Sequence, residues 1–408
     1  MDIALRPQVI FDGLHFKLTG SKSETNRLLL LQALFPGIQL DNASDSDDSA
    51  VMIKALSQTA STIDVHHAGT AMRFLTAFFA AKEGATVTVT GSSRMQERPI
   101  SILVEALRSI GADITYQSNE GFPPLLIKGK TLSGGAVSMH GNVSSQYISA
   151  LLLIAPKLEQ GITIKLHGEI TSMPYIKMTL ALLERIGVKT SFTGHVIQVF
   201  PHAGESIAGT LAVESDWSSA SYFYSIIALA SAGTSVSLSA YRQNSLQGDA
   251  ALAAIYSLLG VDTIYSGNTI TLQKRQSDLT LLRLNLADTP DLAQTIAVSC
   301  FGLRIPCELT GLHTLKIKET DRLQALENEL GKLGAAVSVT SDSLSLKAAE
   351  ILRDNVIINT YSDHRMAMAF APLAVKVPIT IQDAGVVSKS YPGFWDDLER
   401  LGFHVARL

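Results

Sequence analysis

Apolar helices that follow short polar openings recur along the chain. In each copy, polar or small residues lead into a run that is apolar nearly all round, with few charges after the first turn. The pattern occupies residues 20–34, 66–80, 142–155, 215–230, 289–301 and 362–375. Because a helix without a polar face is stable only in an interior, the sequence predicts six buried helices.

Amphipathic helices alternate with these buried ones. They carry more Glu, Lys and Arg, end at a glycine and lead into a β-like stretch, as in "LVEALRSIGADITY". Glycine just past a helix supplies a left-handed cap. The glycines recur at intervals of 68 to 76 residues, at Gly111, Gly187, Gly260, Gly334 and Gly402, and a weaker copy without glycine spans residues 52–65. These helices should face solvent.

The two helix types define a repeat of strand, buried helix, strand, outer helix and strand, with room for one more strand. Six such units average about 68 residues and would fill the chain of 408. Two groups of three units predict two α/β domains, with junctions near Gly20 and near Val213–Ser215. The alternative is that the interval reflects ordinary α/β units, but five glycine-ended copies favour a true repeat.

Composition and charge narrow the function. Hydrophobic residues make up 46% and charged residues 17%, the net charge is −4, and no Lys/Arg run reaches four residues. This argues against nonspecific nucleic-acid binding, which needs a broad basic surface. With two cysteines, no apolar window of membrane-spanning length and no basic, apolar leader, we expect a cytoplasmic protein without a membrane span.

The helix openings concentrate the candidate chemistry, since helix N-termini bind anions. "GSKSETNR" places Lys22, Ser23 and Arg27 at the first opening, but its glycine spacing does not match a nucleotide-binding P-loop. Ser23 as a simple N-cap is the alternative. Further openings carry Gly69, Thr70, Arg73, Arg94, Glu97, Arg98, Ser144, Ser145, Gln146, Ser172 and Tyr175, each of which could also serve capping, turns or surface ion pairs.

The C-terminal half holds the stronger candidates. "ADTPDLAQT" places Asp288 and Asp291 around a helix start, and "KIKETDRL" gathers Lys318, Glu319 and Arg322 among further charges. A charge run is by default a solvated face. "YSDHRMAMAF" departs from that default, because Asp363, His364 and Arg365 lead directly into a buried helix and need partners there. Lys389 lies in the last polar loop, "SKSYPGF".

Several kinds of site are excluded by the motifs. There is no H-E-x-x-H, no Cys/His metal cluster, no G-x-S-x-G and no G-x-G-x-x-G after a strand. We therefore expect no metal and no organic cofactor. The remaining prediction is a cleft rich in Lys and Arg, with one or two acids.

As a set, these motifs resemble the EPSP synthase (3-phosphoshikimate 1-carboxyvinyltransferase) family of enolpyruvyl transferases. The matching stretches include "GSKSETNR", "AGTAMR", "RMQERPI", "GNVSSQY", "NSLQGD", "KIKETDRL" and "YSDHRMAM", and they run in one order from residue 20 to residue 394. The resemblance implies two domains of three βαβαββ units each, an inside-out α/β barrel-like fold with the active site in the interdomain cleft. It places residues 21–213 in the first domain and residues 1–20 with 214–408 in the second.

The reaction that the resemblance implies transfers the enolpyruvyl group of phosphoenolpyruvate to the 5-hydroxyl of shikimate 3-phosphate, through a tetrahedral ketal. It needs no cofactor, and we expect a monomer that binds these two small molecules and neither nucleic acid nor membrane. By resemblance, shikimate 3-phosphate is held by Ser23, Arg27, Ser144, Ser145, Ser172, Tyr175, Asp291 and Lys318. Phosphoenolpyruvate is held by Lys22, Gly69, Arg94, Gln146, Arg322, Arg365 and Lys389. The catalytic residues are Asp291, which takes the hydroxyl proton, with Glu319, Lys318 and Lys22.

Three positions depart from the family pattern. His67 stands where Asn is common, Phe74 replaces a common Pro, and Thr314 occupies a position often held by a substrate-binding Asn. Two other functions stay open at this point. One is the UDP-N-acetylglucosamine enolpyruvyl transferase, which usually has a loop cysteine that neither Cys300 nor Cys307 resembles. The other is a non-catalytic anion-binding module, which would not need Asp291, Lys318 and Glu319.

Overall fold

The structure is a computed structural model, which describes residues 1–6, 10–58, 60–202 and 209–408. Its internal contacts divide the chain into two compact units. One, called here the continuous unit, is Lys22–Val213. The other, the discontinuous unit, combines Met1–Ser21 with Glu214–Leu408.

The six predicted buried helices are confirmed, and three of them form the interior of each unit. In the continuous unit they are α1 (Lys22–Leu34), α3 (Gly69–Ala81) and α6 (Ser145–Ile154), and in the discontinuous unit α8 (Trp217–Leu229), α10 (Ala293–Leu303) and α12 (His364–Phe370). Within each unit the three pack against one another. Most of their side chains are buried on every face, which is why their sequences lack a polar stripe.

The outer helices bury one face only. They are α2 (Asp47–Ser57), α5 (Ser101–Ser109), α7 (Met173–Arg185), α9 (Leu252–Leu258), α11 (Arg322–Lys332) and α13 (Phe394–Arg400). All five glycines that were expected to end them have positive φ angles, between 81° and 105°, so the predicted left-handed caps are confirmed. Shorter helices are α4 (Ser93–Gln96) and the 3-10 helices η1 (Ala155–Lys157), η2 (Gly248–Ala251), η3 (Pro290–Leu292), η4 (His313–Ile317), η5 (Ala371–Val375) and η6 (Ala384–Lys389).

Five open four-stranded sheets of the described residues repeat one pattern, a parallel pair followed by two antiparallel pairings. In the continuous unit they comprise β4 (Thr62–Asp64), β5 (Thr86–Thr90), β6 (Asp113–Tyr116) and β7 (Leu125–Lys128), then β8 (Gly135–His140), β9 (Ile162–His167), β10 (Thr190–Thr193) and β11 (Val196–Val199). In the discontinuous unit, the strands are β1 (Ile3–Arg6), β2 (Leu14–Lys17), β13 (Ser235–Ser239), β14 (Val261–Ser266), β15 (Thr269–Lys274), β16 (Leu282–Asn285), β17 (Cys307–Thr310), β18 (Val337–Val339), β19 (Leu344–Leu346), β20 (Val356–Ile358), β21 (Ile379–Ile381) and β22 (His404–Arg407).

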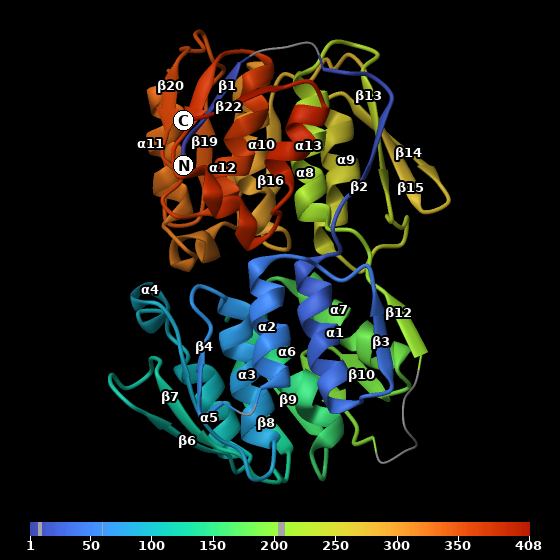
Figure 1. The fold of residues 1–408 in the computed structure, drawn as a ribbon, viewed down its shortest axis with the longest axis vertical. Coiled ribbons are helices and arrows are strands. Elements are labelled where there is room, and N and C mark those ends of the chain that lie inside the picture. The colour runs from blue at the N-terminus through green and yellow to red at the C-terminus, as the bar shows by residue number, and fades with distance from the viewer. Residues whose placement is uncertain (7–9, 59, 203–208) are drawn as a thin grey trace. The chain divides into compact units, whose positions relative to one another are not determined.

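The N-terminal strands complete two sheets of the discontinuous unit. β1 lies between β21 and β22, antiparallel to both, so the blue strand in Figure 1 lies among red ones. Ile3 and Leu5 are fully buried there. β2 pairs in parallel with β13. In the other four-stranded sheets this position holds a strand that leads into a buried helix of the same unit, whereas β2 leads into α1 of the continuous unit. Without residues 1–21, both sheets would therefore lack a strand.

The first repeat differs from the expected unit. Its β3 (Ile38–Asp41) pairs only with β12 (Gly209–Ala212), in parallel, in a two-stranded sheet (Figure 1). The stretch read as a weaker glycine-free copy contains the end of α2 and then β4, which begins the next sheet; Thr59 within it lies outside the described residues. Within the described residues no antiparallel hairpin follows α2, and the glycine that caps the other outer helices has no counterpart there.

Candidate functional site

Charged side chains from four elements of the discontinuous unit meet in one group, called here the Asp291 cluster. Asp291 lies in η3, Lys318 and Glu319 follow η4, Arg322 begins α11, and Asp363 and Arg365 begin α12. Ser218 of α8 and Asp249 of η2 adjoin them. The packing of α10 against α11 and α12 brings these helix starts together. The structure thus unites the predicted residues Asp291, Lys318, Glu319, Arg322 and Arg365.

Arg322 is the centre of the cluster, and its side chain is 2% exposed. Its Nε donates to Asp363 Oδ2 at 2.7 Å, its Nη1 to Asp291 Oδ1 at 2.9 Å and its Nη2 to Glu319 Oε2 at 2.9 Å. Burial opposes its charge, but the three carboxylates outweigh burial and raise the pKa of Arg322. A planar guanidinium with five donors suits this role better than a lysine would.

Asp291 is held by three cations. Arg365 Nη2 donates to its Oδ2 at 3.3 Å, and Lys318 Nζ lies 3.4 Å from its Oδ1, which also accepts from Arg322. Burial alone would raise the pKa of this carboxyl, but Arg365, Lys318 and Arg322 together lower the pKa well below its usual range. Asp291 is therefore an ionised carboxylate whose direct partners are three cations.

Asp249 is a member of the cluster that the sequence analysis did not single out. It is 4% exposed, and one oxygen accepts from the Ser218 hydroxyl, which in turn accepts from Arg365 Nη2 at 3.3 Å. The other oxygen, Oδ1, is buried without a hydrogen-bond partner among the described residues. Burial, partly offset by Arg365, raises the pKa of Asp249 to about 6. The sequence did contain a signal for Asp249, because this residue ends the stretch "NSLQGD", which matches the family pattern.

Lys389 lies at the end of η6, beside the turn that precedes Asp363. Its Nζ donates to the backbone carbonyl of Ser362 at 2.7 Å. Lys389 is half-buried and forms no ion pair with the described residues. Its ammonium group therefore keeps donors for a ligand.

In the continuous unit, the first helix opening holds Lys22 and Arg27. Lys22 Nζ is 3.4 Å from Asp48 Oδ2, at the start of α2. Arg27 is buried, and its guanidinium donates to the Thr179 and Ser149 hydroxyls and to the carbonyls of Ser23 and Tyr175. Burial lowers the pKa of Arg27 to about 10, so it stays charged at neutral pH. Four of its five donors are used within the protein, which leaves one for a ligand.

The serines divide into caps and non-caps. Ser144 is the N-cap of α6 and accepts from the Gln146 N–H at 3.4 Å. The Gln146 side chain donates to the Thr70 hydroxyl at 3.0 Å and so joins the starts of α6 and α3. Ser172 stands at the N-cap position of α7 with a φ of 53°, yet its hydroxyl forms no cap bond. A strained residue whose hydroxyl does no capping is the stronger candidate for ligand binding.

Gly69 begins α3, and Arg98 lies directly against it. A Cβ added at Gly69 would be 2.6 Å from Arg98 Nη1, too close for any side chain to fit without moving the guanidinium. Arg94, the predicted ligand, instead pairs with Glu97 at 3.1 Å, and its side chain is 46% exposed. The structure thus brings Arg98, rather than Arg94, to Gly69.

The three departures from the family pattern have different surroundings. His67 Nδ1 is 2.9 Å from the Ser92 hydroxyl, and the buried Phe74 ring lies 5.4 Å from the Arg27 guanidinium. Phe74 therefore supports Arg27 by a cation–π contact. The Thr314 hydroxyl is buried and has no hydrogen-bond partner among the described residues.

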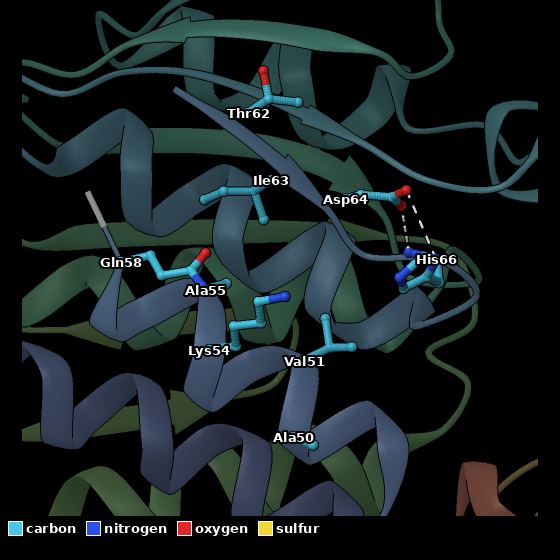
Figure 2. A pocket seen from close by; sticks show the side chains of 9 residues that line it. All are labelled: Ala50, Val51, Lys54, Ala55, Gln58, Thr62, Ile63, Asp64 and His66. Carbon is cyan, nitrogen blue, oxygen red and sulfur yellow. Dashed lines mark hydrogen bonds and ion pairs between the residues drawn. The ribbon is translucent and has the colours of Figure 1, made fainter. Parts of the chain in front are cut away.

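A surface cavity of about 330 Å³ lies between α2 and β4. Figure 2 shows Lys54, Asp64 and His66 among its lining residues, with Asp64 bound to the His66 backbone N–H at 2.8 Å. None of the predicted site residues lines it. Within the described parts of the chain, no group of three or more His, Cys, Asp or Glu side chains is arranged to hold a metal, and no helix is long and apolar enough to cross a bilayer.

Sequence comparison finds the same family over most of the chain. Residues 57–398 match the model of the EPSP synthase (3-phosphoshikimate 1-carboxyvinyltransferase) family. A 3-phosphoshikimate 1-carboxyvinyltransferase of Bacteroides fragilis is 48% identical over 394 residues, covering 95% of each chain. One from Aliivibrio fischeri is 36% identical over 428 residues, covering 98% of this chain and 99% of its own.

Solved structures share the fold. An EPSP synthase from Acinetobacter baumannii superposes with a TM-score of 0.79 at 21% identity, covering 100% of both chains. An enolpyruvyl transferase from Streptomyces tendae gives a TM-score of 0.76 at 14% identity, covering 99% of this chain and 98% of its own. At these identities the structures establish the fold alone, and the predicted enolpyruvyl transferase fold is confirmed.

Proposed function

The chain belongs to the EPSP synthase family, and on that premise we propose that it transfers the enolpyruvyl group of phosphoenolpyruvate to the 5-hydroxyl of shikimate 3-phosphate. The products are 5-enolpyruvylshikimate 3-phosphate and phosphate, on the shikimate pathway to chorismate and the aromatic amino acids. The observation that carries this proposal is the Asp291 cluster, in which one carboxylate is surrounded by Arg322, Arg365 and Lys318.

The substrates explain why the site is rich in cations. Phosphoenolpyruvate brings a phosphate and a carboxylate, and shikimate 3-phosphate brings one of each as well. Opposite charges 4 Å apart attract by roughly 4 kcal/mol at an effective dielectric of about 20. Fixed cations therefore supply binding energy and stabilise the charge that develops during the reaction.

We assign phosphoenolpyruvate to Lys22, Gly69, Gln146, Arg322, Arg365 and Lys389, and we add Arg98. Arg98 takes the place predicted for Arg94, since it lies against Gly69 while Arg94 is exposed and paired with Glu97. Shikimate 3-phosphate is assigned to Ser23, Arg27, Ser144, Ser145, Ser172, Tyr175, Asp291 and Lys318. Ser172 offers a hydroxyl that does no capping, and Arg27 one remaining N–H.

Asp291 acts as the base that takes the 5-hydroxyl proton. The hydroxyl oxygen adds to C2 of phosphoenolpyruvate while C3 receives a proton, which gives the tetrahedral ketal. Loss of a proton from C3 and departure of phosphate then restore the double bond. Lys318, Glu319 and Lys22 serve the proton transfers.

Substrate binding itself activates this base. Without substrate, the cations hold the pKa of Asp291 far below the value of a useful base. Phosphoenolpyruvate bound to Arg365 and Arg322 neutralises part of their field, so the pKa of Asp291 rises in the complex. Proton abstraction thus becomes efficient only when phosphoenolpyruvate is in place.

Phosphate release provides the direct test. We expect the purified protein to release inorganic phosphate only when phosphoenolpyruvate and shikimate 3-phosphate are both present. Release with UDP-N-acetylglucosamine in place of shikimate 3-phosphate would assign the other enolpyruvyl transfer. Binding of both substrates without turnover would identify an anion-binding module instead.

The protein acts in the cytoplasm as a monomer. Large exposed apolar side chains of the described residues belong to separate elements, among them Ile53 of α2, Ile102 of α5, Leu258 of α9 and Ile264 of β14. Single exposed apolar residues are normal on a monomer. Light scattering at assay concentrations should give the mass of one chain, 43.7 kDa; twice that mass would contradict the monomer.

A further inference from the structure

Two consecutive strained residues precede the charged start of α12. Tyr361 and Ser362 both have a φ of 54°, in the left-handed region that residues other than glycine, asparagine and aspartate rarely occupy. The next residue, Asp363, binds Arg322 and caps α12 by accepting from the Arg365 N–H at 2.8 Å. Whatever fixes this turn therefore fixes two members of the Asp291 cluster.

A buried carboxylate holds the turn. The Tyr361 hydroxyl donates to Glu329 Oε1 at 2.7 Å, and Glu329 is 0% exposed. Its other oxygen accepts from the Asn359 N–H at 3.0 Å and pairs with Lys332 Nζ at 2.6 Å. Glu329 therefore binds the segment on both sides of Thr360, in addition to its own helix.

The same helix holds both ends of the segment. Glu329 and Arg322 both belong to α11, Glu329 about two turns after Arg322. The chain from residue 359 to residue 363 is thus tied to α11 first by Glu329 and then by Arg322. Two attachments to one rigid helix can hold a strained turn that neither would hold alone.

The turn also positions Lys389. The Ser362 carbonyl accepts from Lys389 Nζ at 2.7 Å, and the direction of that carbonyl depends on the backbone angles of the turn. A turn that relaxed to negative φ would move the carbonyl, the Asp363 carboxylate and the start of α12 together.

We propose that Glu329 and Tyr361 are a positioning pair that holds the 361–362 turn strained and thereby sets Arg365 and Lys389 for phosphoenolpyruvate. The inference rests on the proposed function, which assigns those two cations to that substrate. Neither member of the pair touches the reacting atoms. They act through the turn.

Tyr361→Phe in the full-length protein tests the pair, since it removes the hydroxyl and keeps the ring. We expect the KM for phosphoenolpyruvate to rise about tenfold, while the KM for shikimate 3-phosphate stays within about twofold. Tyr116→Phe is the matched control, because the buried Tyr116 hydroxyl has no hydrogen-bond partner among the described residues. It should leave both constants unchanged.

A glycine rescue separates positioning from general stability. Glycine adopts positive φ without steric cost, so Ser362→Gly added to Tyr361→Phe should recover most of the lost phosphoenolpyruvate affinity. Because glycine at this φ also stabilises the folded protein as a whole, KM is measured well below the melting temperature of every variant, where a change in global stability leaves KM unaltered. Glu329→Leu should raise the same KM, and adding Tyr361→Phe to it should cause little further loss, because each change removes the Tyr361–Glu329 hydrogen bond. If Glu329→Leu does not fold, the glycine rescue still shows whether the turn positions the two cations.

Arg365→Ala separates the inference from the site assignment. If Tyr361→Phe leaves the phosphoenolpyruvate KM unchanged, or raises both KM values equally, while Arg365→Ala raises the phosphoenolpyruvate KM, the positioning pair is overturned and the site stands. If Arg365→Ala also leaves that KM unchanged, the assigned site itself is wrong.

Discussion

At the scale of single residues, the Asp291 cluster depends on which side chains share a donor or a charge. The Arg322 guanidinium donates hydrogen bonds to three carboxylates, and the Asp291 carboxylate pairs with three cations. Removal of one partner leaves another buried charge uncompensated, which is why changes here have large effects. The three predictions that follow separate binding, proton transfer and stability.

Arg98 and Arg94 form a natural test pair. Arg98→Ala should raise the KM for phosphoenolpyruvate by roughly tenfold or more, since a charge-assisted hydrogen bond contributes about 1.5–3 kcal/mol. Arg94→Ala should change it by less than about twofold, because exposed ion pairs contribute at most about 1 kcal/mol. Steady-state kinetics with phosphoenolpyruvate varied would show the difference. The opposite order would restore Arg94 as the ligand.

Asp291→Asn tests the proposed base. The amide keeps the shape but cannot accept the 5-hydroxyl proton, so turnover should fall by roughly 10²–10⁴-fold. Binding of both substrates, measured by calorimetry, should stay within about tenfold. A variant that turns over at the full rate would exclude Asp291 as the base.

Asp249 predicts an unusual dependence of stability on pH. Its pKa is raised to about 6, so between about pH 4 and 6 the unfolded chain releases this proton and the folded protein keeps it. Stability is therefore lost as pH rises through this window, by about 3 kcal/mol at most. Asp249→Asn should remove that slope and raise the melting temperature above pH 6 by several degrees.

The exposed Asp278→Asn is the matched control for Asp249→Asn, since it also removes one carboxylate from the discontinuous unit. Melting curves at pH 4, 5, 6 and 7 distinguish the two variants. Parallel pH profiles for Asp249→Asn and the unmodified protein would contradict the assignment of that slope to Asp249.

At the scale of elements, glycine position explains why the outer helices end where they do. Gly334 follows α11 with a φ of 100°, while Gly331 lies inside α11 with nothing within 4 Å of an added Cβ. The first glycine provides a backbone conformation that other residues avoid, and the second only weakens the helix. Two glycines three residues apart therefore have opposite roles.

Alanine substitution should give opposite signs at these two glycines. Gly334→Ala should destabilise the protein by about 1–3 kcal/mol, because of its positive φ. Gly331→Ala should stabilise it by about 0.5–1 kcal/mol through helix propensity. Urea denaturation of both variants measures the two free energies. A loss of stability in Gly331→Ala would contradict this account.

At the scale of the whole molecule, three short strands determine how the chain divides into units. β12 ends the continuous unit and pairs with β3, and β1 and β2 belong to sheets formed by residues after 213. The continuous unit is therefore a single stretch, while the other requires both ends of the chain. Fully buried side chains such as Ile3 and Leu5 make the N-terminal strand part of the core.

The two units should differ in whether they fold when expressed as separate fragments. Residues 22–213 expressed alone should fold and unfold cooperatively, since all their described strands find partners within the fragment. Residues 214–408 alone should not, because two sheets would lack a strand and expose an edge. Circular dichroism with urea denaturation tests both fragments, and addition of residues 1–21 to the second should restore cooperative unfolding. Cooperative unfolding of residues 214–408 alone would contradict this prediction.

The sequence by itself determined the helices and their surroundings. Six helices without a polar stripe had to be buried, and glycines with positive φ had to end the outer ones, because both follow from local side-chain and backbone chemistry. It also marked Asp363 and Arg365 as charges that enter an interior and need partners. These features depend on neighbours in the chain, so a sequence pattern reveals them.

Only the tertiary structure decided which strands pair and which side chains meet. Pairing of β1 with β21 and of β12 with β3 joins segments more than 160 residues apart, and short strands carry no signal for such a choice. The same holds for Arg98 against Gly69, for Asp249 beside Ser218, and for Glu329 under the 361–362 turn. Each is a contact in space between residues whose local sequence fits a surface ion pair, a cap or a solvated helix equally well.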